Sequence, residues 1–223
     1  MASQFPFFEE NPKQKAPVKG KRPPPLPLDK CETIGEQQLN PQGLFTDPTK
    51  PLLLLFGFIA IGCIDIASDI SKLVHEGITN VLNCYQKLED VDEEVKKKYK
   101  PVISLLCLPF LDSNGANLIA QLPAAFDFIE QTKKNNGKIL VHCYAGISRS
   151  VSIVMAYLIW VNYKEYKTID DVFVHVKSIR VEADPNFSFS GQLKVFLGLK
   201  KENPEIALTE LCEMVSTEIR KLE

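Results

Sequence analysis

Short apolar runs alternate with longer amphipathic stretches along most of the chain. Five runs rich in aliphatic, β-branched and aromatic residues have strand length and are bounded by turn-forming residues, which predicts strands. The predicted strands are residues 52–56, 58–61, 78–84, 102–108 and 138–142. The first two meet at Gly57, which predicts that they form a pair.

Apolar residues three and four positions apart predict helices between and after these strands. The predicted helices are residues 67–76, 118–134, 151–163, 168–180, 189–199 and 203–222, with a short charged helix or turn at 91–98. Gly77 stops the first, Pro123 should kink or divide the second, and the almost continuously apolar third predicts a buried central helix. The alternation indicates an α/β domain, in which helices flank a largely parallel central sheet.

The first fifty residues follow a different pattern. They hold nine of the fifteen prolines and show no sustained apolar period. Such a segment buries too little apolar surface to offset the entropy that ordering would cost. We therefore expect a disordered, proline-rich and basic tail at residues 1–50 and a folded domain at residues 51–223.

Charge and hydropathy exclude two classes of partner. With 26 basic and 28 acidic residues, the chain lacks the broadly basic surface that general nucleic-acid binding requires. The apolar run at residues 52–64 contains two glycines and is shorter than the roughly 18 residues that span a bilayer. We therefore expect no nucleic-acid partner and no membrane span.

The cysteines indicate the compartment. They are scattered singly, without the C-x-x-C spacing of structural zinc sites: Cys31, Cys63, Cys84, Cys107, Cys143 and Cys212. The amino terminus lacks the basic stretch followed by an apolar run that marks a secretory signal. We expect free thiols, no metal or other cofactor, and a reducing compartment that is cytoplasmic, nuclear or both.

One segment, residues 141–150, concentrates reactive and anion-binding groups. A predicted strand ends at His142, a loop follows, and a hydrophobic helix begins near Arg149. This order aims backbone N–H groups and a helix N-terminus at one point, which forms an anion site. Gly146 permits a backbone conformation that a side chain would obstruct, and the planar fork of Arg149 can bind two phosphate oxygens.

Cys143 lies at the base of this predicted anion site. A free thiol has a pKa of about 8.5, and the positive end of a helix lowers it to roughly 3.5–7.5. The field that binds phosphate therefore also prepares a thiolate. The implied reaction is attack by Cys143 on phosphorus, which gives a phosphocysteine intermediate.

The leaving oxygen then needs a proton from an acid near the carboxyl edge of the sheet. Asp112 follows a predicted strand in a polar loop, and we expect it to protonate the leaving oxygen and then to activate the hydrolytic water. Ser150 can hydrogen-bond the Cys143 sulfur and ease its departure. His142 is expected to orient the loop rather than to act as a base.

The motif His-Cys-x-x-Gly-x-Ser-Arg-Ser at residues 142–150 resembles that of the small, atypical dual-specificity phosphatases of the protein tyrosine phosphatase superfamily. The resemblance extends over roughly residues 55–197. Further matches stand in the family's order: Asp112 ahead of Asn117-Leu118, residues 124–129, Ala156-Tyr157-Leu158, Pro185-Asn186, Phe189 and Gln192-Leu193. Residues 55–62 depart from the family's usual entry strand, which concerns surface recognition rather than chemistry.

The resemblance implies metal-free hydrolysis of phosphotyrosine and of phosphoserine or phosphothreonine in proteins. The phosphate-binding loop would comprise His142, Cys143, Tyr144, Ala145, Gly146, Ile147, Ser148 and Arg149. Two alternatives stay open: a phosphatase of a phosphoinositide, glucan or RNA 5′-phosphate, and a phosphoprotein-binding scaffold. The uncharged variable positions of the loop and the retained nucleophile, arginine and acid favour the protein phosphatase.

Cys84 and Cys107 end predicted strands that could run beside the reactive strand. Either could form a disulfide with Cys143 under oxidation, as resolving cysteines do in some relatives of the family. A buried spectator thiol is the simpler interpretation of each.

The tail carries two short partner motifs. Lys21-x-x-Pro24-x-x-Pro27 fits a ligand for an SH3-type domain. The basic cluster Lys19, Lys21 and Arg22, followed by Leu26-x-Leu28, resembles a docking peptide for mitogen-activated protein kinases. A solvated linker is the simpler interpretation of the whole stretch.

Overall fold

Four short strands form one parallel sheet within residues 52–221, the part of the chain that the computed structural model describes. The strands lie in the order β1-β4-β2-β3, and each is parallel to its neighbours. This sheet confirms the α/β class and the parallel arrangement expected from the sequence. The strands are β1 (Ile59–Gly62), β2 (Ile78–Asn83), β3 (Ser104–Cys107) and β4 (Lys138–His142).

The carboxyl ends of all four strands lie level at one edge of the sheet. His142, the last residue of β4, pairs with Gly62 of β1 and with Asn83 of β2. Asn83 in turn pairs with Cys107, the last residue of β3. The loops that leave these strands therefore start side by side, which is where α/β proteins place their sites.

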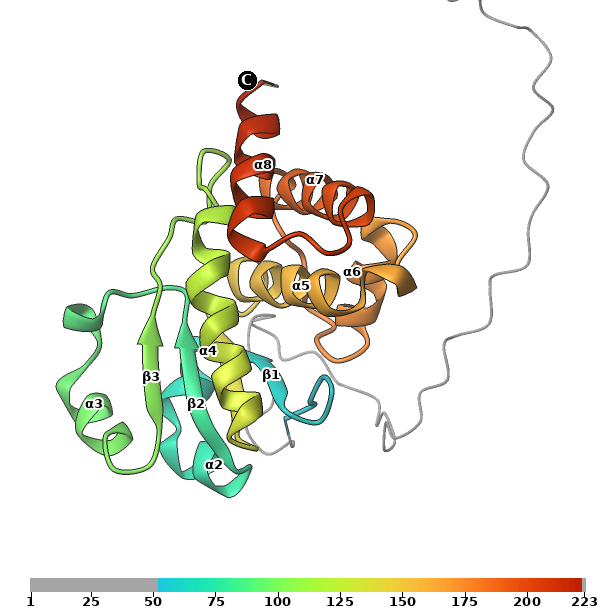
Figure 1. Cartoon of the computed structure of the whole chain (residues 1–223). Helices are drawn as coiled ribbons and strands as arrows, with labels where there is room; N and C mark the ends of the chain where they lie inside the picture. The colour runs from blue at the N-terminus through green and yellow to red at the C-terminus, as the bar shows by residue number, and fades with distance from the viewer. Residues whose placement is uncertain (1–51, 222–223) are drawn as a thin grey trace, which may run out of the picture. The chain divides into compact units, whose positions relative to one another are not determined.

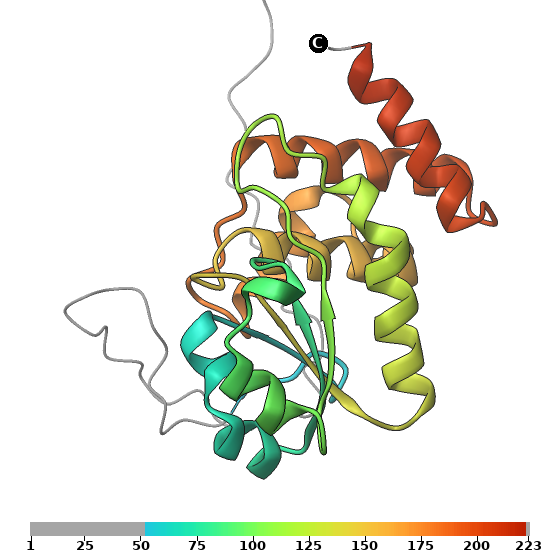
Figure 2. The ribbon, with the colours of Figure 1, turned by 90° about the vertical axis from the view of Figure 1, so that its left-hand side faces the viewer.

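Helices cover both faces of the sheet, as the two perpendicular views in Figures 1 and 2 show. One face carries α1 (Ile64–Ser68), α2 (Ile70–His75) and α3 (Glu93–Tyr99). The other carries α4 (Leu122–Lys134) and α5 (Arg149–Asn162), with α6 (Ile169–Lys177), α7 (Phe187–Glu202) and α8 (Leu208–Arg220) packed beyond them. Short 3-10 turns occur at Leu88–Asp90, Ile119–Gln121 and Tyr163–Glu165.

The side chains of β4 alternate between the two layers. Ile139 and Val141 belong to the core under α4 and α5, whereas Leu140 belongs to the core under α1, α2 and α3. All three are fully buried, so the strand is apolar on both faces, as central parallel strands are. This position explains why residues 139–141 form a continuous apolar run instead of an alternating one.

The predicted buried central helix is confirmed as α5. Its residues 150–159 are all buried, and it packs against α4, α6 and α7. Burial on all sides fixes the helix in place, and with it the position of Arg149 at its amino end.

Residues 52–61 do not form the predicted strand pair, so that prediction was wrong. Leu55 and Ile59 make a single antiparallel bridge, and the chain reverses at Phe56 and Gly57, whose φ angles are 51° and 75°. In the described structure this single bridge is all that joins the two runs, so no ladder forms between them. The second run pairs with β4 as β1 instead.

Two predicted helices are divided. The helix predicted at 67–76 is interrupted at Asp69, whose carboxylate caps the first turn of α2. The pattern at 118–134 is divided near Pro123, as expected, into a 3-10 turn and α4. Pro123 lies in the first turn of α4, where its missing N–H would have no intrahelical partner. The other predicted helices are confirmed, with ends that differ by five residues or fewer.

The sequence also led to two expectations about the whole chain, no membrane span and a disordered tail, and the described residues bear only on the first. No helix between residues 52 and 221 is long and apolar enough to cross a membrane. The tail predicted at residues 1–50, and with it the domain boundary near residue 51, lies outside the described residues and stays a prediction.

The last helix, α8, docks on the core through its buried face, and truncation of a side chain on that face tests the docking. Leu211 is fully buried in the core shared with α5 and α7, whereas Glu213 on the same helix is exposed. We expect Leu211→Ala to lower the free energy of unfolding by about 2–5 kcal/mol, because a buried leucine leaves a cavity when it is truncated. Urea unfolding measures this, with Glu213→Ala as the matched control expected within about 0.5 kcal/mol of wild type. Equal effects of the two substitutions would show that α8 does not dock as described.

Candidate active site

The loop of residues 143–148 joins β4 to α5 at the carboxyl edge of the sheet. β4 ends at His142 and α5 begins at Arg149, as the sequence predicts. Because β4 lies between β1 and β2, the loop leaves the middle of the sheet and is flanked by two neighbouring strand ends. The loop and the amino end of α5 together therefore face a single small volume.

Gly146 lets the loop press against the end of β1. Its φ angle is +70°, a region that side chains disfavour. A Cβ atom at this position would lie 2.5 Å from the carbonyl oxygen of Gly62, a backbone atom that cannot move aside. The glycine predicted from the sequence is thus required both by conformation and by space.

The carbonyl groups of residues 144–147 all point away from the inside of the loop. Each accepts a hydrogen bond from a donor outside the loop: the N–H groups of Ile64 and Asp184, and the guanidinium of Arg180. The bonds are Ile64 N to Tyr144 O at 3.0 Å, Arg180 Nη2 to Ala145 O at 3.0 Å, Arg180 Nε to Gly146 O at 3.0 Å and Asp184 N to Ile147 O at 2.9 Å.

These outward carbonyls direct the next N–H groups inward. No peptide bond of the described chain is cis, and in a trans peptide the C=O and the following N–H point in opposite directions. The N–H groups of residues 145–148 therefore face the inside of the loop. One of them is already engaged, because Gly146 N donates to the Cys143 sulfur at 3.3 Å. Convergent N–H groups at a helix N-terminus form an anion site.

The sulfur of Cys143 lies at the centre of this ring of donors. The residue is 1% exposed, and its Sγ accepts hydrogen bonds from Ser150 Oγ and Gly146 N, each at 3.3 Å. Burial by itself raises the pKa of the thiol. The bonds from Ser150, the charge of Arg149 and the N–H of Gly146 together outweigh burial, so the pKa of Cys143 lies below its ordinary value.

Arg149 reaches from the first turn of α5 across the mouth of the loop. Its Nη1 donates to the carbonyl of Phe110 at 3.3 Å, and its Cζ lies 5.3 Å from the ring centroid of Tyr85. Its buried Nε has no hydrogen-bond partner among the described residues, and Asp112 Oδ2 lies 3.6 Å from it. An unsatisfied guanidinium N–H beside an anion site is a donor available to a phosphate oxygen.

Asp112 is held beside the loop by two hydrogen bonds. Ser148 Oγ and Asn186 Nδ2 both donate to its Oδ1 at 2.7 Å. Asn186 also donates its backbone N–H to Ser148 Oγ at 3.1 Å, which closes a three-residue network. The structure thus brings the predicted acid, 31 residues before the cysteine in the chain, to the edge of the loop that contains Cys143.

His142 lies behind the loop and is 3% exposed. Burial lowers its pKa to about 4, so the imidazole is neutral at neutral pH. Its Nδ1 lies 3.2 Å from the carbonyl oxygen of Cys143. This geometry fits a side chain that orients the loop.

The two cysteines considered for redox control, Cys84 and Cys107, lie one and two strands away from the strand that leads to Cys143. Cys84 follows β2, next to β4, and its N–H donates to the His142 carbonyl at 2.8 Å. Burial, followed by the nearby Cys143, raises the pKa of Cys84. Cys107 ends β3, one strand further away. All described cysteines have free thiols, and a redox role of Cys84 or Cys107 stays a prediction.

Three residues complete the site without having been assigned a role from the sequence. Arg180 binds loop carbonyls, Asn186 binds the carboxylate of Asp112, and Tyr85 lies under Arg149 and beside Tyr144 at a ring-centroid distance of 5.3 Å. Their partners are backbone atoms or residues far along the chain, which no local pattern reveals. Within residues 52–221 no group of three or more His, Cys, Asp or Glu side chains could hold a metal ion.

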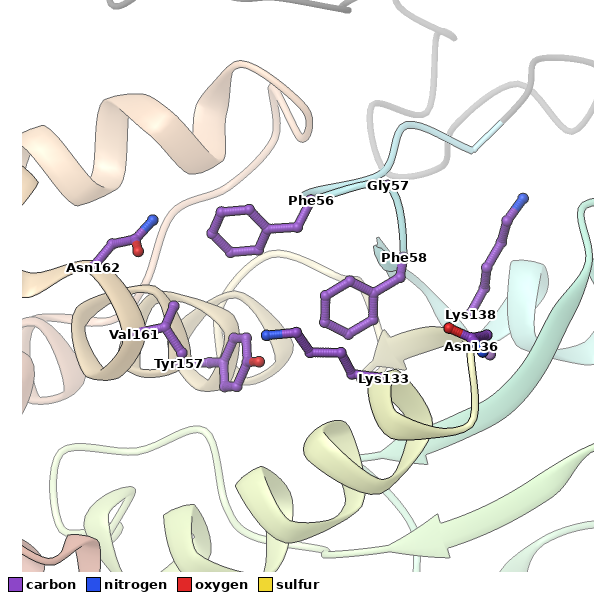
Figure 3. A pocket seen from close by; sticks show the side chains of 10 residues that line it. Phe56, Gly57, Phe58, Lys133, Asn136, Lys138, Tyr157, Val161 and Asn162 are labelled. Atoms are coloured by element: carbon purple, nitrogen blue, oxygen red, sulfur yellow. The ribbon is translucent and has the colours of Figure 1, made fainter.

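A separate hollow of about 600 Å³ lies at the opposite, amino edge of the sheet (Figure 3). Phe56, Phe58 and Lys133 extend toward Tyr157 and Val161 of α5 there. The residues that line it include no cysteine, serine or carboxylate, and so none of the groups that the sequence assigns to the reaction. The chemistry of the described chain concentrates at the loop instead.

Comparisons with known proteins agree with this geometry. The model of the dual specificity phosphatase catalytic domain matches residues 62–197. The chain is 38% identical over 135 residues to Protein-tyrosine-phosphatase MKP1 of Arabidopsis thaliana, covering 60% of this chain and 16% of that protein. It is 34% identical over 152 residues to Dual specificity protein phosphatase 6 of Homo sapiens, covering 68% of this chain and 37% of that protein. It is 32% identical over 174 residues to Dual specificity protein phosphatase 2 of Mus musculus, covering 74% of this chain and 52% of that protein.

The chain thus spans about half or less of the length of these curated relatives. Solved structures extend the likeness to the fold. A variant of human DUSP28 superposes with a TM-score of 0.57 at 25% identity, over 69% of this chain and 98% of that one. The human tyrosine phosphatase-like serine/threonine/tyrosine-interacting protein gives 0.55 at 27% identity, over 66% and 95%. With a family model that matches more than half of its length, the chain belongs to the dual specificity phosphatase family.

Proposed function

We propose that this chain hydrolyses phosphotyrosine and phosphoserine or phosphothreonine in proteins through a phosphocysteine intermediate. The observation that carries the proposal is the position of the Cys143 sulfur inside a ring of inward N–H groups, with Arg149 at its mouth. That ring provides a place for three phosphate oxygens directly over a thiol with a lowered pKa.

In the first step, the thiolate of Cys143 attacks phosphorus. A sulfur–phosphorus bond forms, the bond from phosphorus to the leaving oxygen breaks, and that oxygen takes a proton from the carboxyl group of Asp112. Arg149 and the loop N–H groups stabilise the charge that spreads over the other oxygens. Ser148 and Asn186 hold the carboxyl group at the edge of the loop, where the leaving oxygen would lie.

In the second step, water replaces the sulfur. The carboxylate of Asp112 accepts a proton from the water, whose oxygen attacks phosphorus. The sulfur–phosphorus bond breaks, and its electron pair returns to Cys143 as thiolate. The hydroxyl of Ser150 and the N–H of Gly146, both within 3.3 Å of the sulfur, stabilise that departing thiolate and release inorganic phosphate.

The protein substrate class rests on the relatives and on the loop itself. Tyr144, Ala145 and Ile147 add no positive charge for a polyphosphorylated headgroup, which argues against a phosphoinositide. The paired rings of Tyr85 and Tyr144 beside Arg149 offer an aromatic wall for a substrate side chain. Turnover of phosphopeptides, compared with phosphoinositides, phosphoglucan and RNA 5′-phosphates, separates the protein substrate from the alternatives.

A phosphoprotein-binding scaffold is the second candidate, because one structural neighbour is itself described as phosphatase-like. The retained Cys143, Arg149 and Asp112 argue for turnover instead. Mitogen-activated protein kinases as substrates, and an SH3-type partner for Lys21-Pro27, depend on tail motifs outside the described residues. Both partners, and a cytoplasmic or nuclear location, stay predictions.

Substitution of the nucleophile tests the reaction. We expect wild-type protein to hydrolyse an aryl phosphate in the presence of a chelator, with inhibition by vanadate. Cys143→Ser should abolish this activity, because a serine hydroxyl is not ionised near neutral pH. Release of inorganic phosphate measures both. Activity that survives Cys143→Ser would overturn the mechanism.

Substitution of the acid tests the role of Asp112 through the leaving group. We expect Asp112→Asn to lower kcat by about 10²- to 10⁴-fold on phosphothreonine peptides, whose alkoxide leaving group needs a proton. The loss should be much smaller on p-nitrophenyl phosphate, since nitrophenolate leaves without protonation. Exposed Asp127→Asn on α4 serves as the control and should leave both rates unchanged. An equal loss on both substrates would assign Asp112 a structural role.

The hydroxyl of Ser150 gives a pH-dependent prediction. Its hydrogen bond favours the thiolate, so Ser150→Ala should raise the pKa of Cys143 and move the rise of alkylation rate with pH upward by about one unit. Iodoacetamide labelling across a pH series measures the midpoint. Ser152→Ala is the matched control, because that hydroxyl donates to the Ser148 carbonyl. An unmoved midpoint in Ser150→Ala would contradict the role.

A further inference from the structure

Residues 178–186 connect α6 to α7, and from residue 180 onward they bind the outside of the phosphate loop at several points. Arg180 binds two loop carbonyls, and the N–H of Asp184 binds a third. Asn186 binds Ser148 with its backbone and Asp112 with its side chain. One short connection thus contacts both the donor loop and the acid.

Arg180 makes two of these contacts with one side chain. It is 2% exposed, and two nitrogens of its guanidinium each lie 3.0 Å from a carbonyl oxygen of the loop. The planar fork of arginine spans two successive carbonyls in fixed geometry, which the single ammonium of lysine cannot do. The pair of bonds therefore fixes the orientation of two adjacent peptide planes.

The burial of this charge needs an explanation. A buried guanidinium is costly unless it is paired, and packing alone would be served at lower cost by an apolar side chain. Nη1 of Arg180 lies 3.3 Å from Glu182 Oε2, which supplies a counter-charge without hydrogen-bond geometry. Nothing in the described surroundings of Arg180 uses its charge except this glutamate and the loop carbonyls.

We propose that Arg180 is a positioning residue: by holding the carbonyls of Ala145 and Gly146 outside the loop, it directs the N–H groups of Gly146 and Ile147 at the Cys143 sulfur and at bound phosphate. The inference rests on the proposed function, because phosphate is the anion that these N–H groups would bind. Without the guanidinium, the two peptide planes lose the only described donor to their carbonyls, and only the bond from Gly146 N to the Cys143 sulfur still restrains one of them directly. An N–H that turns away no longer stabilises either the thiolate or the phosphoryl group.

A purely structural role of Arg180 predicts a different result from a positioning role. If Arg180 only packed the connection, its loss would lower stability or the fraction of active protein, while the remaining active molecules kept a normal thiol. A positioning role changes the thiol and the anion affinity of folded molecules. Titration of Cys143 and its protection by phosphate separate the two.

The experiment uses the full chain with Arg180→Met, which keeps a long side chain but removes the donors, and Arg180→Lys. Arg220→Met, an exposed arginine on α8, is the matched control. Circular dichroism and thermal melting first establish that each variant is folded. Iodoacetamide labelling of Cys143 across pH then gives the thiol midpoint, and inorganic phosphate added as the probe gives the concentration that half-protects the thiol.

We expect Arg180→Met to raise the thiol midpoint by about one pH unit and to raise the half-protecting phosphate concentration at least about tenfold, the effect of one lost hydrogen bond to a charged group. Arg180→Lys should fall between wild type and Arg180→Met, and Arg220→Met should match wild type. Arg180→Lys carries the test alone if Arg180→Met does not fold.

The inference is overturned if folded Arg180 variants keep the wild-type midpoint and phosphate protection within twofold. Neither measurement requires turnover. A wild-type protein that hydrolyses no phosphate ester but whose Arg180 variants shift as expected would overturn the proposed function and leave the positioning role intact.

Discussion

The direction of four peptide planes in the phosphate loop governs the rest of the site. In a trans peptide, whatever holds the carbonyl of one residue also aims the N–H of the next. The carbonyls of residues 144–147 are held from outside, by Ile64 at the start of α1, by Arg180 and by Asp184. A motif of nine residues can therefore bind an anion only after segments on both sides of it in sequence have folded against it.

That constraint explains how a chain with a formal net charge of -2 can present a site that favours an anion. The positive potential comes from backbone dipoles, the start of α5 and the guanidinium of Arg149. A count of charged residues includes only the guanidinium. The same potential offsets the burial of Cys143, whereas burial dominates at its neighbours. His142 is kept neutral by burial, and the pKa of Cys84 is raised by it. Of these three buried groups, only the thiol inside the ring of donors has its charged form favoured.

From the sequence one can predict the residues whose role follows from the residues next to them in the chain. Cys143, Gly146 and Arg149 stand in one contiguous motif between an apolar strand and an apolar helix, so their placement needed no tertiary information. Tertiary contacts decide the rest. Arg180 looks like any helix-end arginine until its carbonyl partners, 34 and 35 residues away, are known. The strand pair expected at 52–61 is reduced to the single bridge between Leu55 and Ile59, whereas β1 pairs along its whole length with β4, a strand 79 residues further along the chain.

The connection from α6 to α7 joins the two halves of the proposed chemistry. Asn186 donates to Ser148 of the loop and to Asp112, while Arg180, six residues earlier, orients the N–H groups around the sulfur. A displacement of this connection would therefore alter the nucleophile's surroundings and the acid's position at the same time. The helices α6 and α7 that anchor its ends pack on α5, the helix whose first residue is Arg149. The helical layer thus does more than cover the sheet: it fixes Cys143, Arg149 and Asp112, the three residues of the proposed chemistry, relative to one another, which the motif alone cannot do.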